Sequence, residues 1–437
     1  MTARIFHTSD WHLGRQIGRF RRDSEIDAVL EEVIEIADDF HPDLIVHSGD
    51  LFDGPRPGLD DMRRAAEALR RLGRIAPVVV VAGNHDTAYV LAFLEYVLNG
   101  RDSRTGDLAR VRFATDARPD GLLVAEYPAQ ESELTLRIGA LPYLHPNRFT
   151  YDFSDPAMMT ATYADRMRTV QADVYRRLAH GRGAQDILLF AAHMFVEGAT
   201  PSYTERQISL AAEYATAATD LPDVAYGALG HIHNPQPVGR VGFPAYYAGS
   251  LLQLDFGETG DTKAVVLAEV GPNREPRIDL EPLTTGRPLI RLQGTLEEIE
   301  PRARRVGDAW VKAEVIVEAP NPYLADTLAK MMPKATIVTI DEHRTGAADR
   351  VLHRETTTGD LPSIEELLHD YLADHGTTGP ALDRAMTTFA HLRAEPDPDD
   401  LAPCCEETLL VDVLAGRPLD RSGLSTVTDT PGTETAR

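Results

Sequence analysis

Short apolar runs alternate with amphipathic segments through the first part of the chain. The apolar runs "ARIFHTSD" (3–10), "DLIVHSGD" (43–50) and "PVVVVAGNHD" (77–86) have the length of buried strands and end in polar residues. Between them, residues 23–40 and 59–73 carry apolar side chains at the spacing of one helix face, and the second segment ends at Gly73. This alternation predicts parallel strands covered by helices.

The same alternation continues to about residue 285. Ser24 and Asp27 fit a capping box that begins the first helix. A long helix is expected near residues 161–180. Further strands are expected at "LTLRIGAL" (134–141), "DILLFAAH" (186–193), "DVAYGALGH" (223–231), "PAYYAGS" (244–250) and "KAVVLAEV" (263–270). We therefore expect one α/β catalytic unit over residues 1–285.

The pattern restarts after Arg287 and predicts a small α/β module over residues 286–345. Its strands are expected at "PLIRLQG" (288–294), "AWVKAEVIVEA" (309–319) and "KATIVTIDEH" (334–343). One helix is expected between the first two strands and another at "PYLADTLAKMM" (322–332).

A polar connector and a helical segment follow over residues 346–393. Ser363 and Glu366 fit a second capping box, and the helix that they begin has one apolar stripe, made by Ile364, Leu367, Leu368 and Tyr371. Residues 394–437 are acidic and rich in Thr, Gly and Pro, so we expect a disordered tail.

Composition limits the class of protein. The 437 residues contain no apolar run of the roughly 20 residues that a membrane span needs, and the N-terminus lacks the apolar centre of a signal peptide. We expect a soluble, cytoplasmic protein without a membrane contact. Only two cysteines occur, Cys404 and Cys405, so a thiolate metal cage is excluded. Any metal must be held by His, Asp, Glu or Asn.

The net charge of −24 argues against a protein that coats nucleic acid by charge alone. Much of this charge lies in the tail, where residues 361–437 hold 15 acidic and 5 basic side chains. The tract "GRQIGRFRR", in contrast, contains Arg15, Arg19, Arg21 and Arg22 with no acid among them. These arginines are candidate phosphate contacts, and a solvated basic loop is the alternative.

Ligand-type side chains follow several of the expected strands. In an open parallel sheet the carboxyl ends of the strands line the ligand crevice, so these residues should converge. Taken singly, each has a structural explanation as a cap, a turn residue or a core histidine. Imidazole, carboxylate and amide ligands together suit Mn²⁺, Fe²⁺ or Zn²⁺, and a carboxylate that bridges two such ions favours in-line phosphoester hydrolysis. The residues are Asp10, His12, Asp50, Asn84, His85, His193, His231 and His233.

The motifs "SDWHLG", "SGDLFD", "AGNHD", "AAH" and "GHIH", in this order, resemble those of the calcineurin-like metallophosphoesterases. More narrowly, "HTSDWHLG", "GDLFDGPRP", "ALGHIHNPQ" and "YAGSLLQLDFGE" are similar to the SbcD family of DNA repair nucleases. The resemblance implies a sandwich of β-sheets flanked by helices, followed by a capping domain.

The resemblance also implies roles for single residues. Asp10, His12 and His233 would hold one metal, Asn84, His193 and His231 the other, and Asp50 would bridge them. His85 would contact the scissile phosphate and help the leaving oxygen depart, with Asp86 orienting it. Asp53 receives no firm role, because some relatives have His at its position and a turn-forming acid is the alternative.

The family implies an ATP-dependent nuclease that works with an SbcC ATPase on DNA. It implies two divalent ions, Mn²⁺ by preference, 3′ to 5′ trimming of duplex ends, endonuclease action at hairpins and two copies of each subunit. The helix at residues 363–374 resembles the segment that docks on SbcC, and packing on its own domain is the alternative. A small-molecule phosphodiesterase, acting for example on a cyclic nucleotide, and a non-catalytic scaffold remain the alternative functions.

Overall fold

The computed structural model describes ten stretches of the chain. They are residues 1–99, 111–118, 121–145, 162–202, 215–239, 241–272, 274–318, 321–344, 364–374 and 379–393. The chain divides into two compact units, Met1–Ala348 and Asp349–Arg437. None of the helices in the described ranges combines the length and the apolar character that a membrane span requires.

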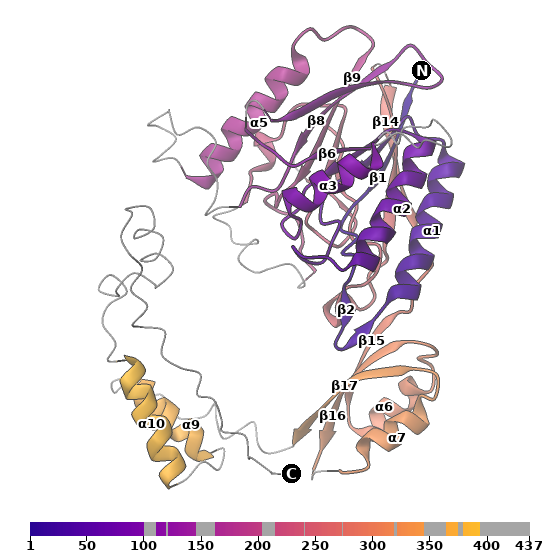
Figure 1. The fold of residues 1–437 in the computed structure, drawn as a ribbon. Helices are drawn as coiled ribbons and strands as arrows, with labels where there is room; N and C mark the ends of the chain where they lie inside the picture. The colour runs from indigo at the N-terminus through magenta and orange to yellow at the C-terminus, as the bar shows by residue number, and fades with distance from the viewer. Residues whose placement is uncertain are drawn as a thin grey trace, which may run out of the picture. The chain divides into compact units, whose positions relative to one another are not determined.

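The first sheet of the larger unit holds the N-terminal strands. Its order is β14 (Arg274–Pro282), β13 (Ala264–Gly271), β1 (Ala3–Thr8), β4 (Leu44–His47), β5 (Val78–Val81) and β6 (Val111–Ala114). The strands from β1 to β6 pair in parallel, whereas β13 and β14 are antiparallel. The helices α1 (Asp23–Phe40), α2 (Leu59–Ile75) and α3 (Ala88–Leu98) cover one face of this sheet (Figure 1). Their apolar side chains pack in one cluster with those of the strands.

The second sheet packs against the other face of the first. Its order is β11 (Gln236–Pro237), β12 (Ala245–Tyr247), β10 (Tyr226–Gly230), β9 (Asp186–His193), β8 (Thr135–Leu141) and β7 (Leu123–Pro128). One apolar cluster joins side chains of both sheets, and another lies between the second sheet and α5 (Tyr163–Ala179). The expected α/β sandwich flanked by helices is confirmed.

A third sheet forms the small α/β module that was expected after Arg287, called the capping module from here on. The parallel strands β15 (Leu289–Gly294), β16 (Trp310–Val317) and β17 (Thr336–Arg344) pack with α6 (Leu296–Ala303) and α7 (Leu324–Met331) around a core of their own. A small apolar cluster joins this module to the hairpin of β2 (Gln16–Ile17) and β3 (Phe20–Arg21).

Two local predictions at helix ends are wrong. Helix α1 begins one residue earlier than Ser24, with Arg22 as its N-cap and no side-chain capping bond, so Ser24 lies inside the first turn and cannot cap it. Helix α2 continues past Gly73 to Ile75, because Gly73 is buried within it and the main-chain hydrogen bonds continue to the Ala76 N–H, which donates to the Leu72 carbonyl oxygen.

The second unit contains two described helices, α9 (Ile364–Asp374) and α10 (Pro380–Arg393), which contact each other. The expected helix of residues 363–374 is therefore present from Ile364 onward. Ser363, and with it the second capping box, lies outside the described residues, as does the tail from residue 394.

Candidate metal centre

All the predicted ligand residues lie at the carboxyl ends of central strands. Asp10 and His12 follow β1, Asp50 follows β4, and Asn84 with His85 follows β5. His193 ends β9, and the pair His231 and His233 follows β10. Because β1, β4 and β5 belong to one sheet and β9 and β10 to the other, the site lies where the same ends of the two sheets meet.

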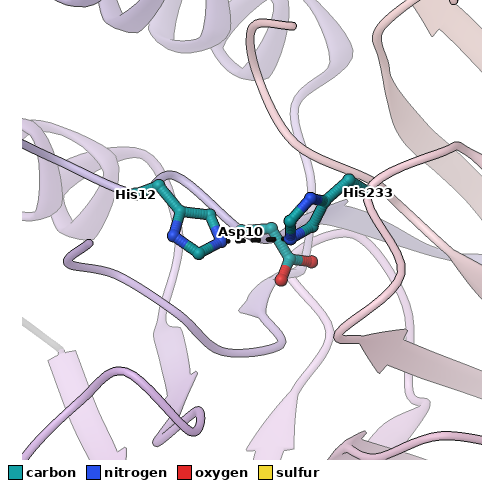
Figure 2. Close-up of side chains that lie close together, drawn as sticks. All are labelled: Asp10, His12 and His233. Atoms are coloured by element: carbon teal, nitrogen blue, oxygen red, sulfur yellow. Dashed lines mark hydrogen bonds between the residues drawn. The ribbon is translucent and has the colours of Figure 1, made fainter. Parts of the chain in front are cut away.

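The first ligand group consists of Asp10, His12 and His233, whose side chains are buried and point toward one another (Figure 2). The Nε2 atoms of His12 and His233 lie 3.2 Å apart. Their Nδ1 atoms face carboxylates, His12 toward Asp53 at 3.3 Å and His233 toward Glu258 at 3.1 Å.

These contacts favour the same tautomer in both rings. The Glu258 carboxylate holds the ring proton of His233 on Nδ1, whereas the Asp53 carboxylate faces His12 Nδ1 without a hydrogen bond and favours a proton there by its charge. Each Nε2 then carries a lone pair. Two facing lone pairs beside the Asp10 carboxylate repel one another in a buried site unless a cation lies among them. The first group therefore fits a divalent ion.

The second ligand group consists of Asn84, His193 and His231. The Asn84 Oδ1 atom lies 2.9 Å from both His193 Nε2 and His231 Nδ1, and these two nitrogens are 3.3 Å apart. His193 Nδ1 lies 2.9 Å from the Ser48 carbonyl, to which it donates, so its Nε2 carries the lone pair. Acceptor atoms again converge on one point, as ligands of a cation do.

The Asp50 carboxylate lies between the two groups. Its Oδ2 atom is 3.6 Å from His12 Nε2 and 3.5 Å from His193 Nε2, while its Oδ1 accepts the His85 main-chain N–H. Burial alone would raise the pKa of Asp50, but the neighbouring imidazoles hold that pKa below its usual range. The structure thus brings together all seven predicted ligands, with Asp50 in a bridging position.

The backbone is strained where it presents these ligands. Positive φ angles occur at Asp10 (50°), His12 (44°), Asp50 (53°) and His231 (107°), a region that non-glycine residues rarely adopt. Such strain costs about 1–3 kcal/mol per residue and concentrates at functional sites.

Two glycines allow the strands to approach. At Gly49 (φ 119°) a Cβ atom would lie 2.1 Å from His193 Nδ1, and at Gly83 it would lie 2.1 Å from Asp50 Oδ1. Any side chain at either position would displace a ligand.

His85 and Asp86 occupy the loop after β5 but contact different partners. The His85 Nδ1 atom lies 2.6 Å from the Asp53 carbonyl oxygen, which orients the ring. The Asp86 carboxylate accepts the main-chain N–H groups of Leu51, Phe52 and Gly83. These three bonds show that Asp86 fixes the loop backbone, and its orienting of His85 stays a prediction. Burial, followed by repulsion from Asp50, raises the pKa of Asp86 to about 6.

The four predicted arginines do not form one surface. Arg22 is buried, where it donates to the Gln253 carbonyl oxygen at 2.5 Å and to Glu25 at 2.8 Å, so it is a structural residue and not a phosphate contact. Arg15 reaches Asp53 at 3.5 Å beside the metal centre, and Arg21 pairs with Asp23 and Asp61. Arg19 is exposed, with its guanidinium over the Phe20 ring.

Sequence reasoning missed two charged residues of the centre, Glu258 and Lys263, and gave Asp53 no firm role. Asp53 faces His12, and Glu258 faces His233. Lys263 donates to Glu258 at 2.7 Å. Burial alone would raise the pKa of Glu258, yet the His233 hydrogen bond and the Lys263 ammonium hold it at about 2. The only signal for Glu258 was its place in the motif "LDFGE".

Comparisons with known proteins agree with this geometry. Residues 3–235 match the family model described as "Calcineurin-like phosphoesterase", and residues 285–376 match the model described as "Type 5 capsule protein repressor C-terminal domain".

Several curated proteins are similar over most of the chain. The SbcD subunit of the SbcCD nuclease of Bacillus subtilis (strain 168) is 32% identical over 72% of this chain and 79% of the relative. The SbcD subunit of Escherichia coli (strain K12) is 26% identical over 75% of this chain and 81% of the relative. The SbcD subunit of Rhodobacter capsulatus is 29% identical over 67% of this chain and 72% of the relative.

Proposed function

This chain belongs to the SbcD family of calcineurin-like metallophosphoesterases and is thus a metal-dependent phosphodiester hydrolase. From this premise we propose that it cleaves DNA as the nuclease subunit of a complex with an SbcC-type ATPase. The observation that carries this proposal is the pair of ligand groups joined by the Asp50 carboxylate. Nothing in that arrangement resembles the thiolate sites of structural metals.

The ligands divide between two positions. Asp10, His12 and His233 would hold one divalent ion, Asn84, His193 and His231 the other, and Asp50 would touch both. Two such ions, Mn²⁺ by our proposal, would supply charge neutralisation for the phosphodiester and acidify water beside it.

His85 is the proposed acid for the leaving group. Its Nδ1–H is held by the Asp53 carbonyl oxygen, so Nε2 is the nitrogen that we assign to the substrate. The half-buried ring lies edge-on to His12 at 4.9 Å between centroids, and His85 forms a further cluster of ligand-type atoms with His12 and Asp50. From this position Nε2 would contact the scissile phosphate and place a proton on the departing oxygen.

A groove of about 870 Å³ lies between the β2–β3 hairpin, the turn of residues 255–259 and the capping strands, and it supports the proposal of a polymeric substrate. Arg15 links this groove to the metal centre, while Arg291 and Lys312 come from the capping strands. Both capping cations are paired with Glu314, so the groove is not strongly basic. This balance fits a subunit that gains much of its DNA affinity from a partner.

Two surfaces support the proposed assembly with two copies of each subunit. Helix α9 provides the segment that we propose for docking on the ATPase, and Tyr371 on it is exposed. Helix α3 exposes the large apolar side chains of Tyr89, Phe93, Tyr96 and Val97, which a second copy of the chain would cover. Sedimentation of the chain alone would show whether it dimerises.

Cleavage assays on the purified chain test the proposed function. The chain is incubated with Mn²⁺ and a labelled blunt duplex or hairpin, with and without an SbcC-type partner and ATP. We expect ATP-stimulated trimming from 3′ ends and hairpin opening in the complex. Faster cleavage of a cyclic nucleotide than of DNA would indicate a small-molecule phosphodiesterase, and no cleavage of any diester would indicate a scaffold.

A further inference from the structure

The geometry points to Glu258 as a positioning residue for the first metal position. We propose that this carboxylate, together with Lys263, holds the His233 ring so that Nε2 faces the ion. Contacts with the capping module fix the chain turn that carries Glu258. The proposal rests on the ligand division proposed above.

Glu258 and Lys263 hold His233 from two sides. The Glu258 Oε1 atom lies 3.1 Å from the ring Nδ1, while Lys263 Nζ donates to the His233 carbonyl oxygen at 2.9 Å and to Glu258 Oε2 at 2.7 Å. Oε2 also accepts the Leu254 N–H at 2.9 Å. Glu258 is fully buried and Lys263 is 5% exposed, so both charges act in a medium that screens them little.

This arrangement has a directional consequence. A carboxylate on Nδ1 fixes the tautomer and the ring orientation and makes the opposite nitrogen a better electron donor. Since His233 Nε2 lies 3.2 Å from His12 Nε2, a small rotation of the His233 ring would separate the two ligand atoms. Glu258 therefore acts on the metal through His233 and touches neither substrate nor ion.

The turn that carries Glu258 is attached to the capping module. Gln253 donates from Nε2 to the Glu258 carbonyl oxygen at 3.0 Å and accepts the N–H of Leu289, the first residue of β15, at 2.8 Å. Phe256, in the same turn, packs on the cluster that contains Leu289 and Trp310. The position of the capping module thus determines the position of the Glu258 carboxylate.

Metal titration of the full-length chain tests this role without relying on activity. The chain is stripped with a chelator and titrated calorimetrically with Mn²⁺. For Glu258→Gln we expect one of two binding events to weaken by about 10- to 100-fold. The matched control is Glu314→Gln, which removes a buried carboxylate that also pairs with a lysine but lies in the capping sheet. The two Mn²⁺-binding events of Glu314→Gln should have the same affinities as those of the parent chain.

A double-mutant cycle separates positioning from general structural damage. In a His233→Ala background, which we expect to keep only the second binding event, Glu258→Gln should leave that event unchanged, because its effect passes through the His233 ring. The Glu258→Gln variant could fail to fold because the Lys263 charge has lost its carboxylate partner. In that case the double variant Glu258→Gln/Lys263→Met, which removes both buried charges, takes the place of Glu258→Gln in the cycle.

The outcomes are distinguishable. Two unchanged binding events in Glu258→Gln, equal weakening of both events, or a weakened second event when Glu258→Gln is added to His233→Ala would each overturn the role of Glu258. A parent chain that binds only one Mn²⁺ would instead overturn the proposed ligand division.

Discussion

At the scale of single residues, the centre depends on which ring nitrogen of each histidine carries the proton. Acceptors hold the Nδ1–H groups of His193 and His233, and the Asp53 carboxylate faces His12 Nδ1. Each of these rings turns Nε2 toward the proposed ion positions. His231 differs, because its Nδ1 lies 2.9 Å from Asn84 Oδ1 among the second ligand group. The two histidines of "GHIH" therefore use different nitrogens.

Replacing these two histidines one at a time should empty different metal positions. His231→Ala should lose the ion shared with Asn84 and His193, and His233→Ala the ion shared with Asp10 and His12. Metal content by elemental analysis should fall from two ions to one in each variant. Loss of both ions in either variant, or of none, would contradict the division.

Much of the ligand set could be predicted from the sequence because each ligand directly follows an apolar run that forms a central strand. The partners that are distant in the sequence could not be predicted in this way. Glu258 is 25 residues from His233, and a lone acid in a turn resembles a solvated one. His47, which ends β4 beside the ligands, packs edge-on against Trp11, and burial lowers its pKa to about 3. The same local pattern thus yields a core histidine or a ligand.

At the scale of elements, the loop after β4 determines how closely the two sheets approach. Gly49 faces the His193 ring across the gap between the sheets, and the main-chain N–H of Asp10 donates to the Gly49 carbonyl oxygen at 2.9 Å. The strand–helix alternation was visible in the sequence. The β2–β3 hairpin was not visible in the sequence, since its strands have two residues each. This hairpin separates the basic tract into a buried Arg22 and exposed neighbours.

Gly49→Ala should therefore destabilise the fold far more than Gly54→Ala in the same loop. The first substitution meets the His193 ring and an unfavourable φ angle, which together cost at least about 2 kcal/mol. A Cβ at Gly54 meets nothing within 4 Å, so its effect should stay within about 0.5 kcal/mol. Urea unfolding of the metal-free variants measures both, and equal free energies of unfolding would refute this explanation.

At the scale of the larger unit, Glu25 on α1 connects the capping module to the catalytic sheets. Its carboxylate accepts from Trp310 Nε1 at 2.8 Å, from the Arg287 N–H at 2.9 Å and from Arg22 at 2.8 Å. The Arg287 guanidinium lies 4.1 Å above the Trp310 ring. The restart of the pattern after Arg287 predicted a separate module, but a contact between residues 285 positions apart leaves no local signal.

Glu25→Gln should weaken this attachment in a pH-dependent manner. Burial alone would raise the pKa of Glu25, but Arg22, the Arg287 N–H and Trp310 hold it below its ordinary value of 4.5. A lowered pKa contributes stability above pH 4.5, which is lost as the pH falls through the lower folded-state value. The variant should lose about 1–3 kcal/mol at pH 7, and the difference should shrink below pH 4.5.

Tryptophan fluorescence during urea unfolding follows this change, because Trp310 is one of only two tryptophans. Glu31→Gln on the same helix is the control. Its carboxylate forms an exposed pair with Arg71, so the loss should stay below about 1 kcal/mol. A loss for Glu25→Gln that does not change with pH would show that its charge is not the cause.

The central claim is that His85 acts on the phosphodiester while the surrounding residues hold the ions. The most direct measurement is DNA cleavage by His85→Ser, in the complex with the ATPase, alongside its metal content. We predict two bound ions per chain and a cleavage rate reduced by about 10²- to 10⁴-fold. A variant that retains both ions and cleaves at the parent rate would contradict the account.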